Sequence, residues 1–293
     1  MEKGRRSGVL LHISSLPGAF GVGDFGPEAF AFADYLHGAG FSVWQILPLS
    51  PAISIFGYSP YSSPSAFAGN MLFISPRRLC AEGLITEAEL SSHMLPAASA
   101  ADFDAAGRCR RDLLSLSWKR FNGDPEAFSG LRGPFEDFRG ENPLARDYAL
   151  FTLLKERYGD RCWPEWPREF ASRDEGALAA FAAENEEALS FIEFTQFIFY
   201  RQLEALSEYC AARGVTLMGD LPIYVAWDSA DVWSHPGAFD LDAEGRPRCV
   251  AGVLDYFSYR AALGQSSVSG RRCAPTASPG GGKGWRTALN TAG

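Results

Sequence analysis

The feature that most constrains the fold is a pair of short apolar runs separated by one helical segment. Residues 8–13 and 41–49 are apolar almost without interruption, which is typical of strands buried on both faces of a parallel sheet. Between them, residues 28–37 carry one apolar stripe, preceded by Pro27 and followed by Gly38, as expected of a helix. Strand, helix and strand at this spacing form a βαβ unit, so the sequence predicts an α/β fold.

A third strand-like run, residues 215–225, comes after a long stretch with helical periodicity. Residues 147–158 and 184–213 are the clearest amphipathic helices, and Thr86 with Glu89 matches a capping box. We predict that residues 8–13, 42–48 and 215–221 form neighbouring parallel strands of an α/β barrel, with a helical insertion between the second and third. So few strands would leave open sheet edges and an uncovered apolar face.

The domain organisation follows from these patterns. We expect the first barrel strands in residues 1–75, a helical insertion in residues 76–205, a return to the barrel in residues 206–253 and a different tail in residues 254–293. Asp255 is the last acidic residue, and the tail is rich in Gly, Ser, Ala and Arg. This composition is typical of a disordered segment.

Composition excludes several classes of function. A formal net charge of -8 disfavours nucleic acid as a partner, and no apolar run is long enough to span a membrane. The N-terminus lacks the pattern of a signal peptide, so a cytoplasmic protein is expected. The six cysteines and four histidines are scattered, which predicts free thiols and neither a metal site nor a disulfide framework.

Three carboxylates are candidates for chemistry, and each has a structural alternative. Asp220 directly follows the third apolar run, at the strand end where α/β barrels place their sites. There it could bind a sugar hydroxyl, or it could serve as a helix cap or loop anchor. Asp228 and Asp231 fall in a short helical stretch, where acids in the first turn also favour the helix dipole.

Aromatic side chains give a second set of candidates. Tyr58, Tyr61 and Phe67 lie in a loop of residues 51–70 that is rich in Gly, Pro and Ser. Rings with a polar group suit the C–H faces of sugars, although they could equally pin the loop in place. Trp44 lies inside the second apolar run and is expected to belong to the core.

Three ordered motifs resemble those of glycoside hydrolase family 77, the amylomaltases or disproportionating enzymes. The matching segments span residues 7 to about 253. They are His12-Ile-Ser-Ser-Leu-Pro-Gly18 with Gly21-Val-Gly-Asp-Phe-Gly26, Ser59-Pro-Tyr-Ser-Ser-Pro-Ser-Ala-Phe-Ala-Gly-Asn70, and Gly219-Asp-Leu-Pro-Ile-Tyr-Val225 with Asp228-Ser-Ala-Asp-Val-Trp233 and Val250-Ala-Gly-Val253.

The resemblance implies a (β/α)8 barrel of the α-amylase clan and a 4-α-glucanotransferase activity. In this reaction a glucan is cleaved to a covalent glucosyl-enzyme and then passed to the 4-hydroxyl of another sugar. The partners would be maltooligosaccharides or α-1,4-glucans from starch or glycogen, with no cofactor and no metal. Carried over to this chain, Ser59 and Tyr61 match donor-side sugar contacts, and Asp220 matches the aspartate of the third strand near the reacting sugar.

The family's catalytic motifs are not found in this chain. Its nucleophile lies in an Arg-Ile-Asp-His-Phe-Arg-like strand, its acid/base in a Glu-Asp-Leu-Gly-like segment and its third carboxylate in a His-Asp pair. The resemblance ends near Leu254, with Gly264-Gln265 as a remnant. We therefore expect a chain that ends before the catalytic carboxylates and is inactive alone. A non-catalytic glucan-binding fragment and a hydrolase of the same clan are the alternatives, and the loop at residues 59–70 argues against the hydrolase.

Overall fold

The central element is a parallel sheet of three short strands. The computed structural model describes residues 5–54, 57–96, 98–220, 222, 224–248 and 265–266. β1 (Gly8–Leu10), β2 (Val43–Gln45) and β3 (Thr216–Met218) are parallel, in the order β1-β2-β3. Each strand occupies three residues within a predicted apolar run. The prediction of neighbouring parallel strands is confirmed, and with it the α/β class.

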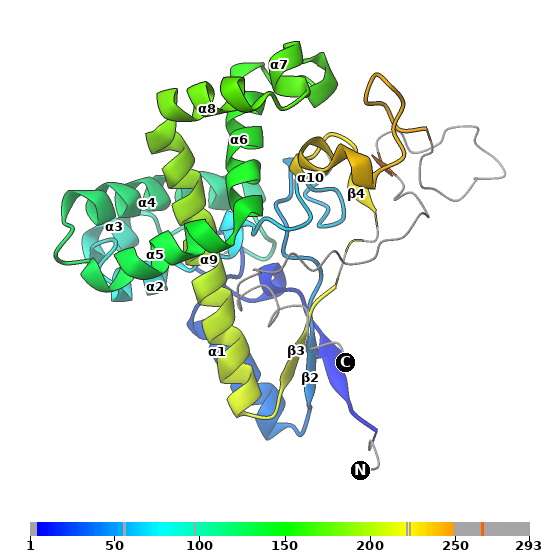
Figure 1. The fold of residues 1–293 in the computed structure, drawn as a ribbon. Coiled ribbons are helices and arrows are strands. Elements are labelled where there is room, and N and C mark those ends of the chain that lie inside the picture. Colours follow the sequence, from blue (N-terminus) through cyan, green and yellow to red (C-terminus); the bar gives the residue numbers. More distant parts are fainter. Residues whose placement is uncertain are drawn as a thin grey trace.

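Among the described residues, the helices cover one face of the sheet. Val9, Trp44 and Leu217 are in register across the three strands and pack in the main core, with Trp44 fully buried. Two helices, α1 (Pro27–Gly38) and α9 (Glu186–Ala212), lie together on the same side of the strands (Figure 1). On β1, the next residue along, Leu10, is 57% exposed. On the other two strands, the residues of this face, Val43, Gln45, Thr216 and Met218, are half-buried. The predicted burial on both faces is therefore not found among the described residues, because their helices cover one side.

Helices fill most of the chain between β2 and β3, as the periodicity predicts. The capping box of α3 is present: Thr86 Oγ1 accepts from the Glu89 N–H, and Glu89 accepts from the Thr86 N–H. The two strongest amphipathic patterns correspond to α6 and α9. The helices of this part are α2 (Pro76–Ala81), α3 (Glu87–Ser92), α4 (Phe103–Gly123), α5 (Ser129–Glu141), α6 (Pro143–Arg157), α7 (Arg168–Ala171), α8 (Glu175–Glu184) and α9.

Short elements complete the described residues. The 3-10 helices are Ile13–Ser15, Met71–Phe73, Trp163–Glu165 and Pro236–Ala238. After β3 come β4 (Val225–Ala226) and α10 (Ala230–Ser234), and β4 pairs antiparallel with β5 (Gln265–Ser266). Apart from β5, the tail expected in residues 254–293 lies outside the described residues, as does the matching segment at residues 250–253. Within the described residues, no helix is long and apolar enough to cross a membrane.

Two apolar clusters form the core. The larger joins the covered face of the sheet to α1, α4 and α9, and around Phe194 it contains a group of rings, Trp118, Phe121 and Phe135, with ring centroids 5.0–6.0 Å from that of Phe194. The smaller cluster packs α6, α8 and α10 around Trp233, which is fully buried. The four described cysteines are free, as predicted.

A buried ion pair links α4 to the loop that follows β1. Arg110 Nη2 lies 2.7 Å from Asp24 Oδ2, and both side chains are almost completely excluded from solvent. The same guanidinium donates to the carbonyls of Ile74 and Phe20. Burial raises the pKa of Asp24 to about 6, although the Arg110 charge opposes this shift. The helical pattern of the sequence gives no sign of this contact between elements 86 residues apart.

Candidate functional site

The predicted sugar contacts Tyr61 and Asp220 meet beyond the carboxyl ends of the strands. The Tyr61 hydroxyl donates to Asp220 Oδ2 at 2.7 Å, across a sequence separation of 159 residues. Asp220 follows β3 by two residues, and Tyr61 comes from the loop that follows β2. Tyr61 is 43% exposed, so its ring remains accessible to solvent. The two side chains thus share one open surface at the end of the sheet.

Ser59, the third predicted contact, shapes the turn that presents Tyr61. Its hydroxyl accepts from the Tyr61 N–H at 3.4 Å, and its carbonyl accepts from the Ser62 N–H at 3.2 Å. Ser59 is half-buried. In this arrangement Ser59 supports the conformation of the loop and lies beside the Tyr61–Asp220 pair.

Ser50 and Asn70 tie the loop to the segment that follows β2. Asn70 donates its backbone N–H to Leu49 and its side-chain amide to the Ser50 carbonyl. The Ser50 hydroxyl donates to the Pro60 carbonyl at 3.2 Å. The middle of the loop at Pro60 and its end at Asn70 are therefore both bonded to residues 49–50, where the loop begins.

From one side, α10 holds the middle of the loop. Asp231 accepts from the Ser65 hydroxyl at 3.0 Å and from the Ala66 N–H at 2.7 Å, while the Ala230 N–H donates to the Pro64 carbonyl at 2.8 Å. Asp231 is buried, and burial raises the pKa of its carboxyl group. Its position in the first turn of α10 agrees with the helix-dipole interpretation, but its contacts lie in the loop.

From the other side, α9 holds the end of the loop. The Gln196 side-chain amide makes both backbone hydrogen bonds of Gly69, accepting at 2.7 Å and donating at 3.0 Å. The Tyr200 hydroxyl donates to the Phe67 carbonyl, and burial raises the pKa of Tyr200. A side chain at Gly69 would collide with the Phe199 ring, so the close approach of loop and helix requires glycine here.

Asp228 has a different role from Asp220. Its carboxylate lies 2.7 Å from Lys155 Nζ and accepts from the Trp163 N–H at 3.1 Å. It thereby joins α6 to the segment that leads into α10. Asp228 and Asp231 are both engaged by structural partners, which leaves Asp220 as the carboxylate of the three that faces the open surface.

The remaining aromatic candidates, Tyr58, Phe67 and Trp44, have different environments. The Tyr58 ring stacks on Phe103 of α4 with centroids 4.9 Å apart, and its hydroxyl bonds to Asp104, so it pins the loop. Phe67 is 40% exposed on the loop. Trp44 is buried and donates from Nε1 to the Leu11 carbonyl at 2.8 Å, which confirms its place in the core.

The site can bind hydroxyl-bearing ligands. The hydrogen bond to Asp220 raises the pKa of the Tyr61 hydroxyl, so the phenol stays protonated at neutral pH and remains a donor. The carboxylate of Asp220 has further acceptor capacity beyond the bond from Tyr61. An accessible ring beside an acceptor is a combination that suits the apolar face and the hydroxyl groups of a sugar. Within the described ranges, no group of His, Cys, Asp and Glu could hold a metal ion.

Two residues hold the loop in a way that the sequence did not predict: Gln196 was not among the candidates, and Asp231 was a candidate carboxylate without this role. Gln196 lies among Phe194, Phe197 and Ile198 on the buried side of α9, and a polar residue inside an apolar stripe was a usable signal. Asp231 had no such signal, because an acid in the first turn of a helix is common.

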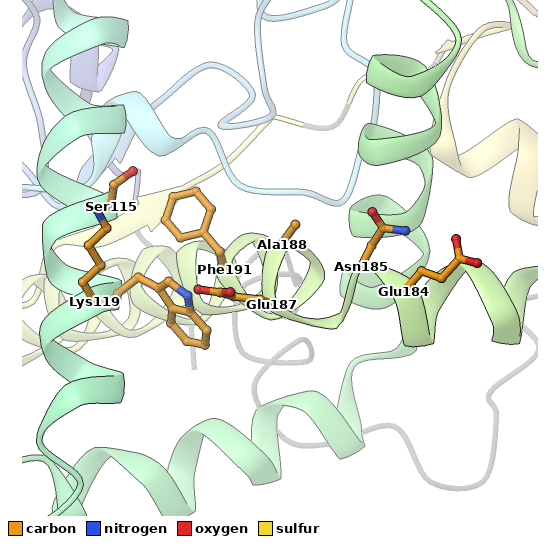
Figure 2. Close-up of a pocket in the computed structure, with 8 residues that line it drawn as sticks. Ser115, Lys119, Glu184, Asn185, Glu187, Ala188 and Phe191 are labelled. Carbon is orange, nitrogen blue, oxygen red and sulfur yellow. The ribbon is translucent and has the colours of Figure 1, made fainter.

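A separate open hollow lies between α4 and α9. Figure 2 shows Ser115 and Lys119 on one side of it and Glu187 and Phe191 on the other. It is lined by Ser115, Trp118, Lys119, Glu184, Asn185, Glu187, Ala188 and Phe191. None of the predicted contact residues lines it, so it is distinct from the surface at the strand ends.

Comparison with known proteins identifies relatives over most of the chain. The profile of the family described as 4-alpha-glucanotransferase matches residues 11–265. The 4-alpha-glucanotransferase of Aquifex aeolicus is 41% identical over 256 residues, covering 87% of this chain and 50% of that protein. The enzyme of the same description from Thermus thermophilus is 42% identical over 268 residues, covering 88% of this chain and 50% of that protein.

A solved structure agrees with these matches. Amylomaltase from Streptococcus agalactiae in complex with acarbose superimposes with a TM-score of 0.81 at 36% identity, covering 90% of this chain and 53% of that one. The chain spans about half the length of the curated relatives it matches.

Proposed function

Because the chain belongs to the 4-alpha-glucanotransferase family, we propose that its strand-end surface binds the donor glucan of a transfer reaction. The reaction would move α-1,4-glucan segments between maltooligosaccharides by a retaining double displacement. The observation that carries this proposal is the Tyr61–Asp220 pair, which joins an exposed ring to a carboxylate at the carboxyl ends of parallel strands.

The proposed ligand is a maltooligosaccharide or a longer α-1,4-glucan from starch or glycogen. The related amylomaltase that binds acarbose supports an oligosaccharide as the ligand class. In our proposal the Tyr61 ring packs against a sugar face, and Asp220 accepts a sugar hydroxyl. Ser59 keeps the turn in the shape that presents Tyr61.

We further propose that the three strands are the beginning of a (β/α)8 barrel. In this arrangement residues 1–75 and 206–253 contribute to the barrel, and residues 76–205 are inserted between its second and third strands. The order β1-β2-β3, the parallel register and the helices between β2 and β3 support it. The open face that exposes Leu10 is the surface that further barrel elements would cover.

We also infer that these 293 residues bind glucan without catalysing its transfer. Double displacement needs a nucleophile and a separate acid/base group. Asp228 and Asp231 are engaged by Lys155 and by the loop, so neither is free to assist Asp220. A glucan-binding, non-catalytic polypeptide is therefore the second candidate function, and it depends on the same surface.

The test is the binding of maltotriose to the purified chain, measured by calorimetry or by ligand-observed NMR. Tyr61→Ala should weaken binding by about 1–3 kcal/mol, or roughly 5- to 150-fold in Kd. Tyr61→Phe, which keeps the ring, should lose less. Tyr35→Ala is the matched control, because Tyr35 is 63% exposed on α1. Equal affinity in Tyr61→Ala and Tyr35→Ala would refute the proposed contact.

A further inference from the structure

The loop of residues 51–70 is linked at two places to residues 220–231, which run from the end of β3 to the first turn of α10. At one, the Tyr61 hydroxyl reaches Asp220. At the other, Asp231 accepts from Ser65 and Ala66. Residues 61–66 and 220–231 are therefore joined at both ends. The bonds of Asp231 to Ser65 and Ala66 restrict the position of the loop, and so the position from which Tyr61 can reach Asp220.

The second link suits a carboxylate because both loop groups at Asp231 are donors, and one of them is the Ser65 hydroxyl. Its oxygen accepts from the backbone N–H groups of Phe67 at 3.2 Å and Ala68 at 3.1 Å. A hydroxyl has two acceptor lone pairs and one hydrogen, so with both lone pairs engaged it can only donate. Asp231 supplies that acceptor, and its second oxygen receives the Ala66 N–H. An amide in its place has one acceptor oxygen for these two donors, so its N–H2 group would face either the Ser65 hydroxyl or the Ala66 N–H.

The helix that carries Asp231 is itself firmly held. Ala230, Val232 and Trp233 are buried in the smaller core cluster, and Trp233 Nε1 donates to the Phe170 carbonyl at 2.9 Å. The Ser229 hydroxyl caps the helix by accepting from the Val232 N–H. Asp231 therefore fixes the loop to a helix that is itself packed in the smaller core cluster.

We propose that Asp231 is a positioning residue, which holds the loop so that Tyr61 lies against Asp220 and is presented to ligand. The inference rests on the proposed glucan contact for its functional meaning, but the geometric claim can be tested without any sugar. Asp231 touches neither of the two contact residues in this arrangement and acts through Ser65 and Ala66.

The experiment uses the full 293-residue chain with tyrosine labelled at the ring carbon that bears the hydroxyl. The titration of Tyr61 is followed by NMR and assigned with Tyr61→Phe. In the unmodified chain the Tyr61 pKa should lie above the ordinary value of about 10, because of its bond to Asp220. In Asp231→Asn, which keeps the volume but loses one of the two bonds to the loop, the pKa should move toward that value. In Asp231→Ala it should move further.

Asp228→Asn is the matched control, since Asp228 lies in the same segment and bonds to Lys155 and Trp163 instead of the loop. It should cost stability without changing the Tyr61 titration. If Asp231→Ala does not fold, Asp231→Asn decides the question, because its size is unchanged. A Tyr61 pKa that is the same in Asp231→Asn as in the unmodified chain would overturn the proposal.

Maltotriose binding, measured on the same variants, separates this inference from the proposed function. Asp231→Asn should weaken binding several-fold, and Asp228→Asn should leave it unchanged. If the unmodified chain does not bind maltotriose while the Tyr61 titration responds to Asp231→Asn, then the glucan proposal fails and the positioning role stands.

Discussion

The helical part of the chain closes its apolar surfaces on itself, whereas the sheet does not. Phe194 of α9 is fully buried among rings from α4 and α5. Leu10, in contrast, is 57% exposed on the edge strand β1. The difference has a physical origin: helices pack against each other through stripes, while a sheet buries both faces only when elements cover both sides.

This comparison assigns stability and ligand binding to different regions. The clusters around Phe194 and Trp233 supply most of the closed apolar packing. The candidate ligand surface lies beyond the carboxyl ends of the strands, where Tyr61 is exposed to solvent. The loop that carries Tyr61 obtains its shape from α9 and α10, through Gln196 and Asp231. The helical part therefore supports the strand-end region as well as itself.

The largest expected effect concerns catalysis in the strand-end region. The chain, incubated with maltotriose, should form neither glucose nor longer oligosaccharides at a measurable rate. Catalytic groups that act as a unit account for rate factors of roughly a million. Asp228 and Asp231 are bonded to Lys155 and to the loop, so neither can act as the second catalytic carboxylate beside Asp220. Chromatography of the products over time gives the answer. Turnover comparable to that of a complete amylomaltase would show that these acids do perform the chemistry.

The next largest effect is on stability, and it should differ between the core around Phe194 and the sheet face at Leu10. Phe194→Ala should lower the free energy of unfolding by about 3–5 kcal/mol, because it leaves a cavity among packed rings. Leu10→Ala should cost about 0.5–1 kcal/mol, because its side chain is already largely exposed. Urea unfolding followed by circular dichroism measures both. Similar losses for the two variants would mean that the sheet face is covered in solution.

The contact between the two regions can be broken at Arg110. Arg110→Ala should destabilise the chain by about 3–5 kcal/mol, because it leaves Asp24 buried without its partner. Asp24→Asn keeps an acceptor for the guanidinium and should lose less. The two variants are compared by urea unfolding at neutral pH. The ion pair would be unimportant if Arg110→Ala unfolded at the same urea concentration as the unmodified chain.

The smallest effect is a pH dependence within the helical part. Hydrogen bonds from Arg120 lower the pKa of Glu89 to about 2, below its ordinary value of about 4.3. The ionised form is thus favoured in the folded state, so its contribution is present above about pH 4 and is lost as the pH falls toward 2. Glu89→Gln should cost about 0.5–1 kcal/mol at pH 7.

Thermal unfolding between pH 2 and pH 7 measures this contribution. The melting temperature of Glu89→Gln should approach that of the unmodified chain as the pH decreases. A constant difference across the range would assign the effect to the shape of the capping box and not to the charge.

Local patterns in the sequence predicted the main strands and helices of this protein. The strands around Val9, Trp44 and Leu217, the helix α9 and the capping box of Thr86 were all predicted, because each depends on the periodicity or spacing of neighbouring residues. The motifs also indicated the family, and they placed Tyr61 and Asp220 just beyond predicted strands.

The side chains that meet across the fold could not be predicted in this way. Tyr61 and Asp220 are 159 residues apart in sequence, and Ser65 and Asp231 are 166 apart. Asp24 and Arg110 are 86 residues apart, and Gln196 and Gly69 are 127 apart, so no local pattern indicates these contacts either. Periodicity reports that a face of an element is buried, but the partner of a polar group depends on how whole elements pack. For that reason the sequence indicated where the contact residues lie, and the fold decided how they are held.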